Sequence, residues 1–79
     1  MRNNDFEFII ASPSNREKLV CEIYYKNEMI AEISQEKEEM VVEIYPSRAK
    51  KWWEIPLTQF QSALEEAKKY LVCGNSNPL

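Results

Sequence analysis

Three short segments of the chain repeat one pattern, in which a glutamate precedes an isoleucine: Cys21-Glu22-Ile23-Tyr24, Ala31-Glu32-Ile33-Ser34 and Val42-Glu43-Ile44-Tyr45. Each segment has the composition of a strand, so its glutamate points away from the apolar side chains on either side of it. Hairpin pairing can bring Glu22, Glu32 and Glu43 into one row. Such a row could bind a hard cation, act as an acid and base pair, or attract a cationic partner.

The alignment of this row depends on two turns. A three-residue loop at Lys26-Asn27-Glu28 places Glu22 opposite Glu32, and a two-residue turn at Lys37-Glu38 places Glu32 opposite Glu43. Both registers keep the apolar face continuous, whereas a slip of one residue would turn it toward water. Like charges directly opposite one another weaken a sheet by roughly 0.2–1 kcal/mol. We therefore expect the row to add nothing to the folded monomer and to serve a cationic partner.

The composition offers little for catalysis or for metal binding. The chain has no histidine, the commonest general base and metal ligand near neutral pH. Gly74 is the only glycine, which rules out a glycine-rich phosphate loop. Cys21 and Cys73 are far apart without histidine, so they form neither a zinc site nor a nucleophilic pair, and both are expected to be reduced and buried. A flat strand face also lacks the enclosing loops and clefts of cation sites and glycosidases. We expect no enzymatic activity, cofactor or metal.

The chain is short and mildly acidic. With 79 residues it is sized for one domain with a single core. No stretch approaches the roughly 20 apolar residues of a membrane span, and the N-terminus lacks the features of a signal peptide. These observations predict a cytoplasmic protein without membrane contact. The net charge of −3 argues against nucleic acid as a direct partner, because phosphate binding needs a basic face.

The hydrophobic periodicity predicts strands at about residues 6–11, 19–25, 29–34 and 40–45, followed by a helix. Residues 52–55 are either a short fifth strand or an extended connector, since Pro56 excludes a central strand. A capping box at Thr58 and Gln61 and a stop at Gly74 place the helix at about 58–73. The predicted fold is α+β, a four- to five-stranded antiparallel meander over about 5–57 with one C-terminal helix packed on one face. Residues 74–79 are expected to form a flexible tail.

The two faces of the predicted sheet differ in composition. The helix is expected to cover the apolar face, which contains Phe6, Phe8, Ile10, Cys21, Ile23, Tyr25, Met29, Ala31, Ile33, Met40, Val42 and Ile44. The other face is expected to stay open and mixes aromatic, aliphatic and acidic side chains: Val20, Glu22, Tyr24, Ile30, Glu32, Ser34, Val41, Glu43 and Tyr45. Open patches of this kind often mark interaction surfaces, although antiparallel sheets also commonly leave one face in water.

The candidate interaction residues come from the open face and from the segment before the helix. If residues 52–55 are extended, Trp52 and Trp53 point to opposite sides, and parity places Trp53 in the core and Trp52 near the surface. Partly exposed tryptophans are frequent anchors of interfaces. The predicted partner-binding residues are Glu22, Tyr24, Ile30, Glu32, Glu43, Tyr45 and Trp52.

The order of these segments resembles a known group of very small bacterial proteins. The resemblance rests on the strand pattern in 6–13, 19–25, 31–36 and 42–46 and on the helix through 67–71, and it spans most of residues 5–72. The group comprises immunity proteins of polymorphic and contact-dependent growth-inhibition toxin systems. The resemblance implies a cytoplasmic protein that neutralises one cognate toxin domain, often a nuclease. Nuclease active sites are basic, so a patch of carboxylates can occupy them.

Two functions follow from the sequence. The first is a non-enzymatic protein-binding inhibitor, an immunity protein that binds a basic toxin domain through an acidic and aromatic surface. The alternative is a small accessory or homodimeric interaction module that uses the open sheet face. Size in solution and the identity of the neighbouring gene distinguish them.

Overall fold

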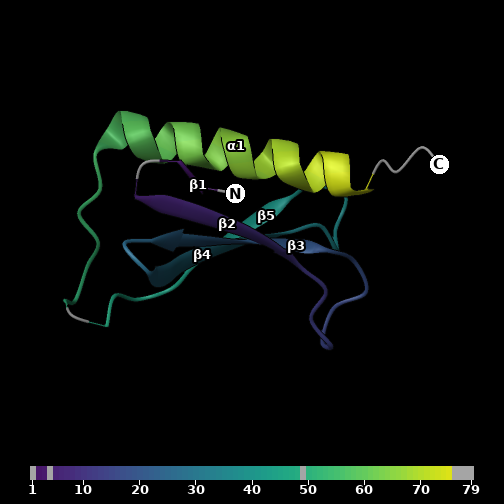
Figure 1. The fold of residues 1–79 in the computed structure, drawn as a ribbon. Coiled ribbons are helices and arrows are strands. Elements are labelled where there is room, and N and C mark those ends of the chain that lie inside the picture. Colours follow the sequence, from purple (N-terminus) through teal and green to yellow (C-terminus); the bar gives the residue numbers. More distant parts are fainter. Residues whose placement is uncertain (1, 4, 49, 76–79) are drawn as a thin grey trace.

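The protein is an antiparallel sheet with one long helix lying across one of its faces (Figure 1). The computed structural model describes residues 2–3, 5–48 and 50–75. The elements in chain order are β1 (Arg2–Asn3), β2 (Phe6–Ala11), β3 (Val20–Tyr25), β4 (Glu28–Ser34), β5 (Val41–Ile44) and α1 (Leu57–Asn75). The strands are adjacent in space in this same order.

The predicted α+β fold is confirmed. Strands β2 to β5 form the expected antiparallel meander, and the only helix in the described part of the chain is C-terminal. The predicted fifth strand at 52–55 is not formed, because these residues make the extended connector that was the alternative. The sheet instead gains the two-residue β1, which pairs with the start of β2.

The helix is longer at both ends than its sequence signals predict. The Phe60 N–H donates to the Pro56 carbonyl at 3.0 Å, so the helix begins at Leu57 and Thr58 is its second residue. The predicted capping box is therefore wrong, since the capping position belongs to Pro56. Gly74 was also expected to end the helix, yet it lies inside it, and no described glycine has a positive φ. Residues 76–79 of the predicted tail lie outside the described residues.

The core lies between α1 and strands β2 to β4. The helix contributes Ala63, Ala67 and Leu71, all at most 1% exposed. Small side chains at two of these three positions let the helix axis come close to the sheet. Aromatic rings fill the space beside them, and the Phe8 and Tyr70 ring centroids are 5.4 Å apart. The helix packs mainly on β2 and β3.

The turn between β3 and β4 differs from the predicted three-residue loop. Lys26 and Asn27 form a two-residue turn with φ of 51° and 69°, the conformation of tight hairpins. Tyr24 then pairs with Met29, whereas Ile23 pairs with Ala31, so Ile30 is the extra residue of a β-bulge. The bulge turns Ile30 into the core, where it is 1% exposed. The prediction that Ile30 lies on the open face is therefore wrong.

The helix leaves part of its own side of the sheet uncovered. Val42 and Ile44 were expected in the core, but they are 43% and 60% exposed because α1 lies over β2 and β3. The predicted positions of the two tryptophans, Trp53 inside and Trp52 near the surface, are confirmed. Trp53 packs against the core and its indole N–H donates to the Tyr45 carbonyl at 2.7 Å, while Trp52 is exposed.

The two cysteines should differ sharply in reactivity. Cys21 is fully buried, and burial, followed by the nearby charge of Glu22, raises its pKa to about 11. Cys73 is exposed, so the expectation that both thiols are buried is wrong for this one. Because only an accessible thiolate attacks a disulfide reagent, one thiol per chain should react quickly at pH 8 and the other only in denaturant. Cys73→Ser should remove the fast reaction, and fast labelling that persists in this variant would contradict the burial of Cys21.

Candidate protein-binding surface

The predicted row of glutamates is present. Glu22 pairs with Glu32, and Glu32 pairs with Glu43, across three neighbouring strands. Glu22 pairs with Glu32 as predicted although the turn is one residue shorter than predicted. The bulge at Ile30 adds one residue to β4 and so restores the register. The row lies on the side of the sheet turned away from α1, which we call the far face. Its central members are Glu22, Tyr24, Met29, Glu32 and Glu43, together with Tyr45, whose hydroxyl bonds to Glu32.

The chain supplies a cation for this row from a loop. The Arg16 Nε donates to Glu32 Oε2 at 2.9 Å, and its Nη2 donates to Glu43 Oε1 at 2.7 Å. Glu32 is only 8% exposed as a residue, so this pair is shielded from solvent more than a surface ion pair. The expectation that the row contributes nothing to the folded monomer overlooked Arg16, which neutralises repulsion between two of the three carboxylates.

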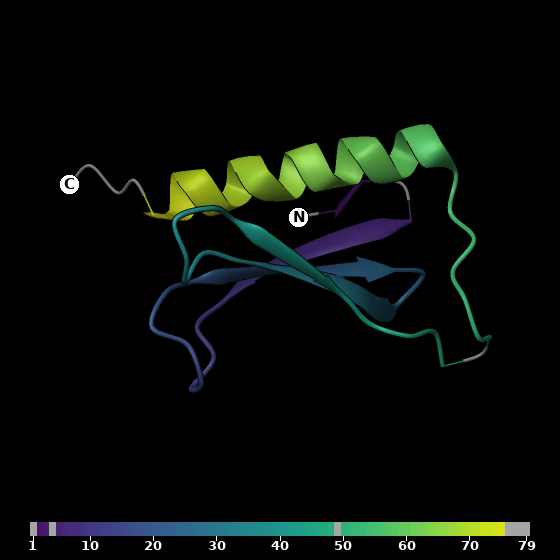
Figure 2. The same cartoon turned by 180° about the vertical axis from the view of Figure 1, so that it is seen from behind.

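The loop that carries Arg16 is bound, at the end that leads into β3, to the segment that follows β4. Residues 12–19 lie on the side away from α1 (Figures 1 and 2). The backbone N–H groups of Lys18 and Glu17 donate to the Glu36 carboxylate at 2.9 and 3.3 Å. These bonds, the one from Lys18 most of all, lower the pKa of Glu36. The predicted open face is thus partly closed at this end, where Val20 and Ser34 are buried.

Two tyrosines on the far face donate to the glutamates. The Tyr24 hydroxyl lies 3.1 Å from Glu22 Oε1, and the Tyr45 hydroxyl lies 3.3 Å from Glu32 Oε1. Burial and then the neighbouring carboxylates raise the pKa of both hydroxyls, so they remain donors at neutral pH. Each ring is therefore fixed at one end by the sheet and at the other by a charged acceptor.

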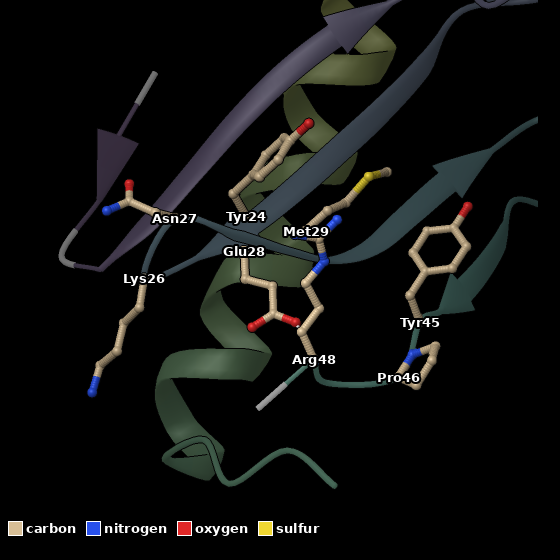
Figure 3. A pocket seen from close by; sticks show the side chains of 8 residues that line it. All are labelled: Tyr24, Lys26, Asn27, Glu28, Met29, Tyr45, Pro46 and Arg48. Atoms are coloured by element: carbon tan, nitrogen blue, oxygen red, sulfur yellow. The ribbon is translucent and has the colours of Figure 1, made fainter. Parts of the chain in front are cut away.

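A pocket of about 720 Å³ opens on the far face beside these rings. Tyr24 and Tyr45 stand on either side of Met29, and the Arg48 side chain extends toward the space between them (Figure 3). The segment after β5 is tied to the sheet here, because the Arg48 N–H donates to Glu28 Oε2. The lining is completed by Lys26, Asn27, Glu28 and Pro46. Aromatic and thioether surface lines the centre of this pocket, where the Arg48 side chain also reaches, and Lys26 and Glu28 add further charges to the lining.

Five of the seven predicted partner-binding residues share this surface: Glu22, Tyr24, Glu32, Glu43 and Tyr45. Ile30 is in the core on the other side. Trp52 is exposed but belongs to the connector, where its indole N–H donates to Glu54 at 3.3 Å. Sequence reasoning missed Arg16 and wrongly placed Met29 on the face covered by the helix, whereas Met29 pairs with Tyr24 on the far face because the turn before it is shorter than predicted. Asn27 tolerates positive φ and was the available signal for the shorter turn, and hence for the position of Met29 on the far face. No sequence signal pairs Arg16 with Glu32 or Glu43, which lie far along the chain.

The described residues hold no group of three or more His, Cys, Asp or Glu side chains that could bind a metal ion. In the same part of the chain, the one helix is too polar to cross a membrane. Comparisons of the chain with protein-family models, curated proteins and solved structures find no match.

Proposed function

We propose that this chain is a non-enzymatic inhibitor that binds a basic protein domain through the far face, in the manner of an immunity protein that neutralises a toxin. The observation that carries the proposal is the aligned row of Glu22, Glu32 and Glu43 with two tyrosines fixed against it. A nuclease toxin is the expected partner, because its phosphate-binding surface is basic and accepts a patch of carboxylates.

The arrangement of the far face favours tight binding. Tyrosine rings supply large contact areas with few rotatable bonds, and the hydroxyl bonds already restrict Tyr24 and Tyr45. Little side-chain entropy is then lost when a partner covers them. The pocket between the rings can receive a side chain of the partner. The far face therefore offers aromatic anchors of the kind that carry much of the binding energy of interfaces, beside carboxylates that a basic partner can pair with.

The charge of the far face selects the kind of partner. Arg16 binds Glu32 and Glu43 but not Glu22, and the Glu43 side chain is still 46% exposed. The chain as a whole carries a net charge of −3. Two copies meeting through this face would bring acidic surfaces together, which costs free energy. The far face is thus better suited to a basic protein than to the homodimer that was the alternative.

The test uses the protein encoded beside this chain, purified and titrated against it. Glu22→Gln should weaken the complex at least tenfold at low salt, mainly through slower association, because this charge steers a basic partner. Glu66→Gln is the matched control, since Glu66 also accepts a bond from a tyrosine hydroxyl, that of Tyr70 at 2.8 Å, but lies on α1.

The proposal has two further readouts in the same experiment. Tyr45→Ala should increase the dissociation rate at all salt concentrations, because aromatic contacts act at short range. Expression of the chain should also protect cells from the neighbouring protein if that protein is toxic. Absence of a complex, or equal losses for Glu22→Gln and Glu66→Gln, would contradict the proposed far-face site.

A further inference from the structure

The last strand of the sheet has an unpaired edge. β5 pairs with β4 on one side, and no described element pairs with its other side (Figure 2). Val42 and Ile44, on the side of α1, are 43% and 60% exposed. Natural proteins usually protect such an edge by keeping it very short, or with charged side chains, a proline or a bulge. β5 has only four residues, Val-Val-Glu-Ile, and one charge, but it contains no lysine or proline and keeps a regular register with β4.

The backbone groups available at this edge follow from the ladder. The Tyr45 N–H donates to the Ile30 carbonyl at 2.8 Å. Bonded and non-bonded pairs alternate along antiparallel strands, so Glu43 and Val41 also face β4. The N–H and carbonyl groups of Val42 and Ile44 therefore point outward, where another strand can reach them.

Apolar surface continues from the edge toward the helix. A groove of about 830 Å³ runs between β5 and α1, with Ile33, Met40, Val42 and Leu64 forming its apolar part. Burying apolar surface contributes about 25 cal/mol per Å², so a partner strand along β5 gains from both the backbone bonds and the side chains next to this groove.

We propose that the occupant of this edge is the β5 strand of a second copy of the chain. The two strands run antiparallel about a twofold axis that crosses the sheet between them, which joins two sheets into one. This symmetry keeps both helices on the same side. It leaves the far face of each copy free, so the proposal is independent of the proposed inhibitor function.

The charges of β5 select one register for this pairing. When Val42 lies opposite Val42 of the second copy, Met40 lies opposite Ile44 and Glu43 lies opposite Val41. A shift in one direction places Glu43 opposite its own copy, and like charges directly opposite each other are unfavourable. A further shift in that direction places Val42 opposite Pro46, which has no N–H to donate. A shift in the other direction places Glu43 opposite Glu39 of the second copy, so the first register alone pairs apolar residues on the side of α1 without opposing carboxylates.

β5 can therefore pair with a copy of itself without placing like charges opposite each other. For this reason we propose a second copy of the chain, rather than a strand of another protein, as the occupant of the edge. A seam formed by a four-residue strand is short, and we expect it to bury less than the roughly 800 Å² per partner of a standard interface. The dimer should therefore be weak, forming at micromolar concentrations and dissociating on dilution.

Sedimentation across a concentration series tests the dimer. The average mass should rise from that of one chain toward twice that value, and Val42→Lys should raise the dissociation constant at least tenfold. Ile9→Lys is the matched control, because Ile9 is a similarly exposed aliphatic residue, 40% against 43%, on a strand far from this edge. A single-chain mass at every concentration overturns the proposal, as does equal weakening by both variants.

Cross-linking tests the register. In a Cys73→Ser background, Val42→Cys should form a disulfide-linked dimer under mild oxidation, because bonded pairs have Cα atoms about 5.5 Å apart, within the range of a disulfide. Glu43→Cys should not, since its copies are offset along the strands. Cross-linking of Glu43→Cys in preference to Val42→Cys overturns the proposed register. Far-UV spectra and melting curves confirm that each variant folds.

Discussion

Replacing Ile30 with alanine should lower the free energy of unfolding by about 3 kcal/mol. Ile30 is 1% exposed and belongs to the core cluster because the bulge in β4 turns it toward α1. The removed atoms leave a cavity in a tightly packed region, which adds to the lost transfer free energy. Urea denaturation of the purified protein measures the effect from the change in midpoint at constant slope.

Ile44→Ala is the matched control for this substitution. Ile44 lies on the same side of the sheet but is 60% exposed, so its truncation should cost roughly 0.5 kcal/mol. The sequence pattern alone predicts the reverse order, because it places Ile44 in the core and Ile30 on the open face. Equal losses, or a larger loss at Ile44, would contradict the bulge.

Replacing Arg16 with methionine should lower the free energy of unfolding by about 2 kcal/mol. The guanidinium binds Glu32 and Glu43, and Glu32 is 8% exposed. Without Arg16, the shielded Glu32 carboxylate loses its cationic partner, keeps the Tyr45 hydroxyl bond, and lies directly opposite two other carboxylates. Methionine keeps much of the apolar stem, so the loss reports on the charge rather than on packing.

A double-mutant cycle isolates this interaction. Arg16→Met should cost much less in a Glu32→Gln background than in the original chain, with a coupling free energy of about 1 kcal/mol or more between the two sites. Independent effects of the two substitutions would mean that Arg16 stabilises the chain through the fold of the 12–19 loop instead.

Much of the fold could be predicted because alternation along a strand is local information. Strands β2 to β5, the C-terminal helix and the packing of Trp53 against the core all follow from side chains a few residues apart. How much of the sheet the helix covers could not be predicted in this way. Whether Ile44 is in the core depends on how far one helix reaches across the sheet, and this is set by packing between segments distant in the sequence.

The candidate site was predictable to a similar degree. The register of the glutamates follows from keeping the apolar face continuous, a requirement that the real turn and bulge satisfy by another route. The pairing of Arg16 with Glu32 spans a loop whose path no periodicity describes. Without that contact, the sequence presents the row as a purely repulsive feature.

The two-residue turn at Lys26 and Asn27 also has a consequence for the order of folding events. A tight turn forms quickly and brings Tyr25 opposite Glu28, and regular zipping from that point would send Ala31 and Ile33 to the side away from α1. The isolated β3–β4 hairpin thus has a competing, misaligned register in which its backbone hydrogen bonds are still formed. Docking of α1, which needs apolar side chains on its own side, penalises that state, as does the loss of the Arg16–Glu32 ion pair. We expect the packing of α1 to select the correct strand register. A chain ending before Leu57 should therefore exchange between the two registers of the β3–β4 hairpin.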